Sequence, residues 1–432
     1  MKGIMIAAPN SNSGKTIISA GLISVLKQNG LDITGFKTGP DQVDRKILEI
    51  SSGKKAGNLD KFLMGEKGLR YALHILKSDY CVIEGVMGCF DGIASTPKNS
   101  SFEIAQDLNI NIILAYTPSG EMFTMIPKLK GLLEFSEGRI KALILNKLKP
   151  ALYPAYKKMV EENLDLTVLG FIPDMQELKF AEGNLGLTVD EHHIKENTLN
   201  ILNEVFNKNI DIKKTLKLFK TVKTAGIPKL KKTNAKVAIA MDDAVNLYYS
   251  ENIFLFENYT EVKYFSPLKN TQLPDCDILY FGSGNIKNYV KELSENKNLK
   301  KQIKDFSERG GIIIAESESV SYLFETFDGY PMCGVFKGFA ESTKALNNFG
   351  YKIIEFKKDC ALGRKGSVIH AAEYHKSKAV TDIPPVFKVT KPIVNKSFED
   401  GFAYKNSLVF FQNINFISCL ENFNFLINLP HL

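Results

Sequence analysis

The first 26 residues constrain the fold of this chain more than any other stretch. An apolar run over residues 4–8 leads into a turn of small polar residues, then into Gly14, Lys15 and Thr16, and then into an apolar helical pattern. This order of strand, polar loop and helix is typical of a phosphate-binding loop, whose backbone N–H groups face phosphate oxygens. The lysine of such a loop reaches the outer phosphates, and the threonine hydroxyl can bind Mg²⁺.

The loop departs from the usual pattern at two positions. Pro9 stands where the pattern has its first glycine, and Asn12 stands where a further glycine is often found. Because asparagine tolerates a left-handed backbone better than most residues, we expect the loop to close. The predicted nucleotide-binding residues of this loop are Ser11, Asn12, Ser13, Gly14, Lys15 and Thr16.

The pattern after the loop predicts a parallel sheet. Continuous apolar runs at residues 33–36, 80–83, 110–115 and 142–145 alternate with helical stretches. Continuous apolar strands separated by helices are typical of an α/β sheet covered on both faces. In such sheets, ligands bind beyond the carboxyl ends of the strands.

Charged side chains follow two of these runs, where each strand would end. Oxygen ligands beside bound phosphates are what Mg²⁺ requires, so several carboxylates near one phosphate loop predict a metal and substrate site. Taken singly, each could instead be a solvated turn residue of an Asp-Gly or Pro-Asp pair. The side chains are Lys37, Asp41, Asp44, Glu84 and Asp91.

The second half of the chain repeats the alternation. A lysine-rich segment and a proline-containing stretch at residues 225–234 precede a fresh apolar run at 237–240, and others follow at 278–281 and 310–315. The length of 432 residues suits two domains of ordinary size. We therefore predict a first α/β domain over residues 1–224 and a second over residues 235–432.

Composition limits the partners. The net charge of +7 comes from lysines scattered along the chain rather than clustered, which favours an anionic small molecule over nucleic acid. The six cysteines form no close pair of metal-ligand type, and the chain opens into a strand without a signal peptide. No apolar run approaches the ~18 residues of a membrane helix. We expect a cytoplasmic protein without membrane or nucleic-acid partners.

The motifs resemble the cobyrinate a,c-diamide synthase family in the order of that family and over nearly the whole chain. The resemblance implies an ATP- and Mg²⁺-dependent synthetase domain followed by a glutaminase domain of the class I triad type. Carboxylates of a tetrapyrrole-derived ring would be phosphorylated and then amidated. The motifs include Ala8-Pro-Asn-Ser-Asn-Ser-Gly-Lys-Thr16, Lys37-Thr-Gly-Pro-Asp41-Gln-Val-Asp44, Glu84-Gly-Val-Met-Gly88, Phe90-Asp-Gly92, Ala240-Met-Asp-Asp-Ala244 and Glu373-Tyr-His375.

The resemblance also implies roles for single residues of the first half. Thr16, Asp44 and Glu84 would be metal ligands, and Asn146 would lie near the adenine. Two departures, Gln42 and the Gly-Asn pair at residues 183–184, fall where the acidic substrate is expected. The implied catalytic residues of this half are Lys15, Asp41, Asp44, Glu84 and Asp91, with Lys37 beside the phosphates.

The second half lacks the nucleophile of the family. Where the family has Glu-Cys-Gly-Gly, this chain has Glu316-Ser-Glu-Ser319, which places Ser317 at the nucleophile position. A serine hydroxyl is far less acidic than a thiol and needs a base and an oxyanion hole built for it. The triad histidine and acid remain as His375 and Glu373, but the oxyanion motif has drifted at residues 282–287. We therefore predict ammonia, free or from another protein, as the nitrogen donor.

Two alternatives stay open at this point. One is an amidoligase of the same mechanism that acts on another tetrapyrrole polycarboxylate, which the departures near the substrate favour. The other is a non-catalytic ATP-binding scaffold, against which the joint presence of the lysine, threonine and carboxylates counts. The ring, its metal, the carboxylates amidated and the oligomeric state, including a homodimer, are not fixed by the sequence.

Overall fold

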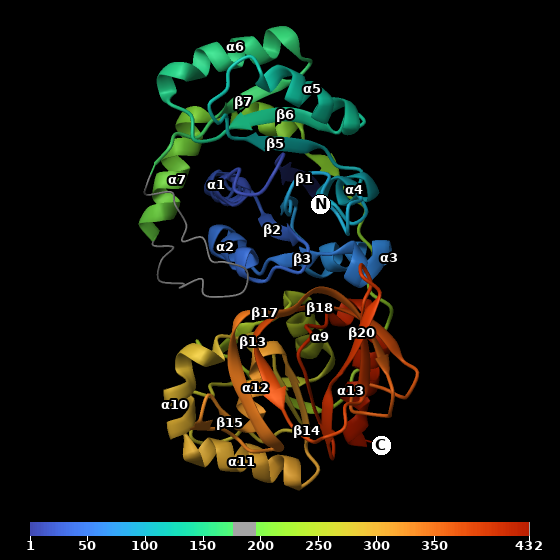
Figure 1. Ribbon diagram of the computed structural model, residues 1–432. Helices are drawn as coiled ribbons and strands as arrows, with labels where there is room; N and C mark the ends of the chain where they lie inside the picture. Colours follow the sequence, from blue (N-terminus) through green and yellow to red (C-terminus); the bar gives the residue numbers. More distant parts are fainter. Residues whose placement is uncertain (176–195, 432) are drawn as a thin grey trace. The chain divides into compact units, whose positions relative to one another are not determined.

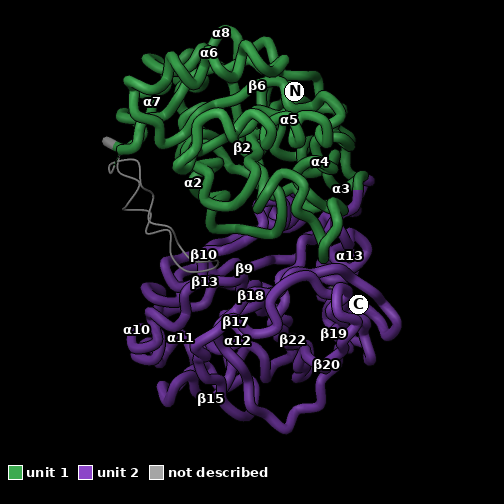
Figure 2. The backbone as a smooth tube through the Cα atoms, turned by 45° about the horizontal axis from the view of Figure 1, so that its top comes forward, with its two compact units in different colours: residues 1–61, 66–184, 189–227 green, residues 62–65, 185–188, 228–432 purple. Residues whose placement is uncertain are grey.

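The protein is described from a computed structural model, which covers residues 1–175 and 196–431. The departure noted at residues 183–184 lies outside the described residues. The chain divides into two compact units, coloured separately in Figure 2. Unit 1 holds the described residues up to position 227 except residues 62–65, and unit 2 holds those four residues and residues 228–431.

A largely parallel sheet forms the centre of unit 1. Its strands follow the order β3-β2-β4-β1-β5-β6-β7, and only the short β8 pairs antiparallel, with β1. Figure 1 labels β1, β2, β3, β5, β6 and β7 of this sheet. The predicted α/β class with a parallel sheet is confirmed. The strands are β1 Lys2–Ala7, β2 Ile33–Thr38, β3 Gly57–Leu59, β4 Tyr80–Glu84, β5 Ile112–Tyr116, β6 Ile140–Leu145, β7 Thr167–Phe171 and β8 Lys220–Thr221.

The core of unit 1 follows from the apolar patterns. Leu22 and Leu26 of one helix pack with Phe206 of another against the strand residues Ile4 and Ile6, and all five are fully buried. This packing fixes the helix after the phosphate loop on the sheet. The helices up to residue 227 are α1 Lys15–Gln28, α2 Val43–Ser52, α3 Lys61–Ile75, α4 Ser101–Asp107, α5 Met125–Phe135, α6 Tyr153–Asn163, α7 Glu196–Asn209 and α8 Ile212–Lys217.

Unit 2 contains a second, mostly parallel sheet. Its order is β11-β9-β12-β14-β22-β21, with only β21 antiparallel to its neighbour. Its strands and the accompanying helices are β9 Lys236–Ala240, β11 Glu261–Phe265, β12 Ile278–Phe281, β14 Ile312–Glu316, β21 Phe402–Tyr404, β22 Ser407–Phe410, α9 Ser250–Tyr259, α10 Val290–Glu295, α11 Lys297–Glu308, α12 Val320–Leu323 and α13 Leu420–Asn428.

A further sheet in unit 2 was not predicted from the sequence. Two long antiparallel strands dominate it, and a separate short pair, β10 Val245–Leu247 and β13 Ser283–Gly284, lies outside it. Its strands are β15 Phe324–Phe327, β16 Tyr330–Pro331, β17 Phe336–Phe356, β18 Val368–Val380, β19 Phe387–Lys391 and β20 Lys396–Asp400. Among the described residues, no helix combines the length and apolar character needed to cross a membrane.

Candidate active site

The phosphate loop connects β1 to α1 and closes as expected. Asn12 adopts a left-handed backbone with φ of 62°, and Gly14 does so with φ of 86°. A Cβ atom added to Gly14 would lie 2.0 Å from the side-chain nitrogen of Asn146, so only glycine fits there. The loop therefore uses asparagine in place of one glycine and keeps the glycine that touches a neighbouring side chain.

The lysine of the loop lies folded over the loop itself. Lys15 Nζ donates hydrogen bonds to the backbone oxygens of Asn10, at 3.0 Å, and Met87, at 2.6 Å. Burial, together with the nearby ammonium of Lys37, lowers the pKa of Lys15 to about 8. Both acceptors are neutral carbonyls, so an anionic phosphate would be a stronger partner for this ammonium. The sequence did not point to these two carbonyls, because any residue type supplies one.

Glu84 lies at the end of β4 and connects two of the predicted residues. Its Oε1 accepts hydrogen bonds from Thr16 Oγ1 at 2.7 Å and from Lys37 Nζ at 2.9 Å. Its Oε2 is buried and has no hydrogen-bond partner among the described residues. Burial raises the pKa of Glu84 against the opposing effect of Lys37. A fully buried carboxylate with one vacant oxygen is a site that a cation would stabilise.

Lys37, at the end of β2, is a buried cation held between carboxylates. Its Nζ lies 2.9 Å from Glu84 and 3.2 Å from Asp44, and it also donates to the backbone oxygen of Gly85. Burial alone would lower the pKa of Lys37, but Glu84, Asp44 and Asp41 outweigh this effect and raise the pKa. The ammonium therefore remains charged and holds the two carboxylates in place.

Asp41 fixes the turn that leads into α2. Its Oδ1 accepts the backbone N–H groups of Val43 at 2.8 Å and Asp44 at 3.2 Å, so it caps the helix and places Asp44. Asn58 supports this turn from β3 by donating to the backbone oxygen of Asp41 at 2.8 Å. Burial and the neighbouring Asp44 raise the pKa of Asp41 to about 6.

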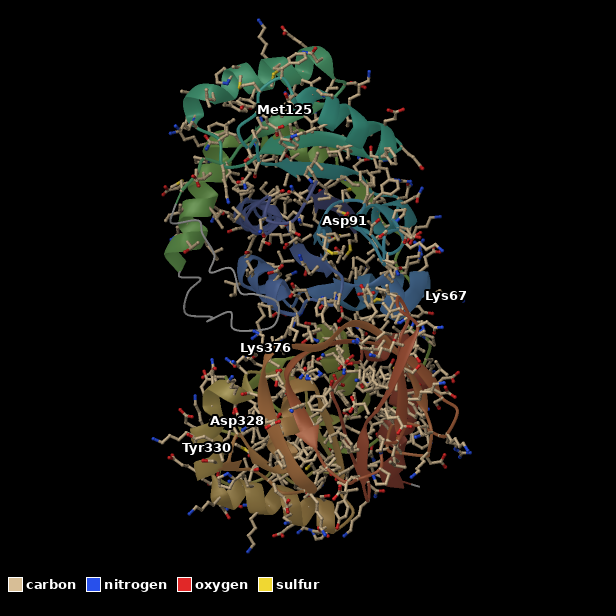
Figure 3. The ribbon with its side chains drawn as sticks, in the orientation of Figure 1. Lys67, Asp91, Met125, Asp328, Tyr330 and Lys376 are labelled. Atoms are coloured by element: carbon tan, nitrogen blue, oxygen red, sulfur yellow. The ribbon has the colours of Figure 1, made fainter. Side chains whose placement is uncertain are left out.

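The remaining predicted residues of unit 1 lie at the edge of this group. Asp91, labelled in Figure 3, is exposed and accepts the backbone N–H of Gly88 at 2.9 Å. Asn146 is buried, and its amide donates to the backbone oxygen of Ser13 at 3.2 Å and to Thr117 Oγ1 at 3.3 Å. These two side chains support loops in the structure, whereas Ser11 and Asn12 are exposed.

In unit 2, Ser317 follows β14 on a tight turn. Its φ is 54°, in the left-handed region, and the residue is fully buried. Its Oγ makes one long hydrogen bond, to the backbone oxygen of Tyr374 at 3.5 Å. The turn therefore keeps the strained backbone that suits a nucleophile, but the hydroxyl meets a carbonyl oxygen rather than a base.

His375 is held by two other partners. Its Nδ1 lies 2.7 Å from the backbone oxygen of Ser377, and its Nε2 lies 2.9 Å from Glu373 Oε1. A carbonyl oxygen can only accept, so Nδ1 carries a proton, and the carboxyl group of Glu373 opposite Nε2 favours a second proton. Burial alone would lower the pKa of His375, but the hydrogen bond and the charge of Glu373 raise it. Neither ring nitrogen is available to take a proton from Ser317.

Glu318, directly after Ser317, is also engaged with β18. Its two carboxylate oxygens accept from the backbone N–H of Lys376 at 2.5 Å and from Ser377 Oγ at 2.7 Å.

Of the residues predicted from the sequence, the structure brings together Lys15, Thr16, Lys37, Asp41, Asp44 and Glu84 in unit 1. It places Ser317, Glu373 and His375 near one another in unit 2, with a hydrogen bond between His375 and Glu373, but Ser317 bonds to the backbone oxygen of Tyr374 instead of to His375.

The two units define a class of protein: a phosphate-loop nucleotide-binding domain joined to a domain of the glutamine amidotransferase type. Residues 4–187 match the family described as CobQ/CobB/MinD/ParA nucleotide binding domain. Residues 236–411 match the family described as CobB/CobQ-like glutamine amidotransferase domain.

Curated relatives identify the family. The chain is 34% identical to a cobyrinate a,c-diamide synthase of Clostridium tetani and 35% identical to one of Clostridium acetobutylicum, each over 98% of both chains. It is 33% identical to one of Methanocaldococcus jannaschii over 88% of both chains. The chain belongs to the cobyrinate a,c-diamide synthase family. The resemblance inferred from the motifs is confirmed, and with it the expected class of enzyme, an amidoligase.

Proposed function

We propose that the protein uses ATP and Mg²⁺ to convert carboxylates of a corrinoid ring into amides, with ammonia as the effective nitrogen donor. The observation that carries this proposal is the group formed by Lys15, Thr16, Lys37 and Glu84 at the carboxyl ends of β1, β2 and β4. Ligands of parallel α/β sheets bind at this edge. Membership of the family supports the corrinoid substrate.

The donor set fits Mg²⁺. No group of three or more His, Cys, Asp and Glu side chains that could hold a metal occurs in residues 1–175 and 196–431. Magnesium needs only one or two carboxylates when phosphates and waters complete its octahedron. Thr16 and Glu84, with its vacant buried oxygen, would hold the ion, and Asp44 would assist. When bound, the ion would neutralise charge on the transferred phosphoryl group.

Phosphorylation solves the chemical problem that amidation presents. A carboxylate is a poor electrophile, and conversion to an acyl phosphate supplies a leaving group that ammonia can displace. Lys15 is placed to turn from its two carbonyl acceptors to the outer phosphates, and Lys37 adds a second fixed positive charge. Fixed charges of this kind stabilise a transition state because they need no reorganisation during the reaction.

The state of the second site supports ammonia as the donor. Glutamine hydrolysis needs a nucleophile, a base and an oxyanion hole. Ser317 has no base within hydrogen-bond reach among the described residues, because both nitrogens of His375 face other acceptors. Glu318 further fills the turn where the family has glycine.

One experiment tests the proposal as a whole. Phosphate release from ATP is measured with a panel of corrinoid and other tetrapyrrole acids, each with ammonia and with glutamine. We expect release that depends on a corrinoid acid and on ammonia, with amide detected by mass spectrometry. Release with a different tetrapyrrole acid would favour the amidoligase of another ring, and ATP binding without release for any acid would favour a scaffold.

A further inference from the structure

A cavity of about 270 Å³ lies in unit 2 beside the turn of Ser317, and it is not accounted for by the proposed reaction. It opens between the segment after β13 and the strands β17 and β18. Liquid water takes roughly 30 Å³ per molecule, so the space suits a metabolite of about ten heavy atoms. The cavity is lined by Gly284, Asn285, Ile286, Lys287, Asn288, Glu318, Thr343, Lys344 and Lys376.

One buried side chain of this cavity lacks the partners it needs. Asn285 is only 7% exposed, and neither its amide nitrogen nor its amide oxygen has a hydrogen-bond partner among the described residues. The backbone holds the residue in place, since its N–H donates to the oxygen of Ala244 at 2.8 Å. A buried amide with both ends unpaired costs free energy unless something else pairs with it. Both amide atoms are shielded from solvent, so a ligand with a donor and an acceptor would satisfy them once the side chain turns into the cavity.

The charges around the cavity specify the kind of ligand. Lys287, Lys344 and Lys376 line it, and within the described residues no carboxylate lies at ion-pair distance from their ammonium groups. Glu318, the single carboxylate among the described lining residues, already accepts two hydrogen bonds from β18. The field in the cavity is therefore positive, and a small ligand carrying more than one negative charge is the complementary partner.

We propose that this cavity binds a small polyanionic metabolite, with carboxylate or phosphate groups on the three lysines and a hydroxyl or carbonyl on Asn285. The ligand is bound and not converted, because the neighbouring hydroxyl of Ser317 has no base. The site is independent of the reaction proposed for unit 1. It is also distinct in charge from a glutamine site, since glutamine carries no net charge.

Titration calorimetry at constant ionic strength tests this site on the full chain. Citrate is the carboxylate probe, and inorganic phosphate is the phosphate probe, used in a Lys15→Ala background so that the phosphate loop does not contribute. We expect saturable binding of at least one probe, weakened about tenfold or more by the double change Lys287→Ala and Lys344→Ala. The matched control Lys301→Ala, on exposed α11 surface outside the cavity, should leave the affinity unchanged.

A second variant separates a binding role of the amide from a structural one. Asn285→Leu keeps the size of the side chain and removes two unpaired polar atoms, so the melting temperature should stay or rise while probe affinity falls. Three results would overturn the proposal. They are no binding of either probe, binding that the double lysine variant does not weaken, and binding of glutamine tighter than that of both probes.

Discussion

The change Ser317→Cys should restore little glutaminase activity, and the size of the deficit follows from burial. Residue 317 is fully buried, and Cys333 and Cys419 are other buried residues of the same unit, in which burial raises the pKa of the thiol to about 12. A thiol with that pKa is about 10⁻⁴ ionised at pH 8, against roughly a quarter for an ordinary cysteine. The fraction of the thiol present as reactive thiolate would thus fall by about three orders of magnitude. Any loss at the oxyanion hole would add to this deficit.

The histidine cannot compensate for this loss. A base that shares the proton of the thiol could offset the effect of burial, but both ring nitrogens of His375 already lie at hydrogen-bond distance from other groups. Opening the turn as well, with Glu318→Gly and Ser319→Gly, removes the carboxylate that binds β18 and should recover part of the activity. The rate of glutamine hydrolysis should be lowest in the unmodified protein, higher in the single variant and highest in the triple variant. All three rates should stay well below the rate of amide formation with ammonia.

The assay is glutamate release from glutamine at pH 8 with ATP and the ring substrate present. Amide formation from ammonia, measured in each variant, shows that the synthetase site is intact. Ser321→Cys serves as the matched control, because Ser321 is another fully buried serine of the same unit, outside the turn. Robust release from the unmodified protein that the substrate stimulates, or a Ser317→Cys rate within tenfold of the ammonia rate, would refute the reasoning.

Three further predictions concern each unit separately. Lys15→Ala should abolish tight binding of Mg·ATP in equilibrium dialysis, whereas Glu84→Gln should abolish turnover by removing the charge beside the metal; normal turnover in either would contradict the site. Fragments 1–224 and 235–432 should each fold, the first with a nucleotide-dependent rise in melting temperature, and an insoluble first fragment would count against this boundary. Burial raises the pKa of Glu316 to about 8 from 4.5, so the native state keeps a proton that the unfolded state releases. Stability should therefore fall as pH rises through that window, by at most ~1.4 kcal/mol per pH unit, and Glu316→Gln should flatten the slope in pH-dependent melting curves.

Much of unit 1 could be predicted because local patterns and one motif agree. Each apolar run found in the sequence became a strand of the parallel sheet, and its polar successors meet at one edge. Parallel topology alone brings Lys37 and Glu84 together, since β2 and β4 are neighbours and pair these two residues in register. That Lys37 would bridge Glu84 and Asp44 depends on side-chain conformations, which the pattern does not specify.

The second sheet of unit 2 could not be predicted for a different reason. Residues 341–350 within β17 are mostly polar and only partly buried, so they show no strand-like alternation. This stretch is extended because β18 pairs with it, with two irregularities in the register. The orientation of the ring of His375 is equally non-local, because it depends on the backbone oxygen of Ser377 and on stacking against Phe411. The serine at position 317 was visible in the sequence, whereas the two hydrogen-bond partners of the His375 ring were not.

The ammonium of Lys37 between Glu84 and Asp44 also bears on the order in which ligands arrive. A divalent ion that entered alone would compete with a cation already seated there, because the charges of Glu84, Asp44 and Asp41 already stabilise that cation. An ion that arrives on a triphosphate brings its own countercharge, and Lys37 can then turn toward the phosphates. Metal and nucleotide should therefore load together, and the nucleotide-free protein should melt at the same temperature with Mg²⁺ as with a chelator.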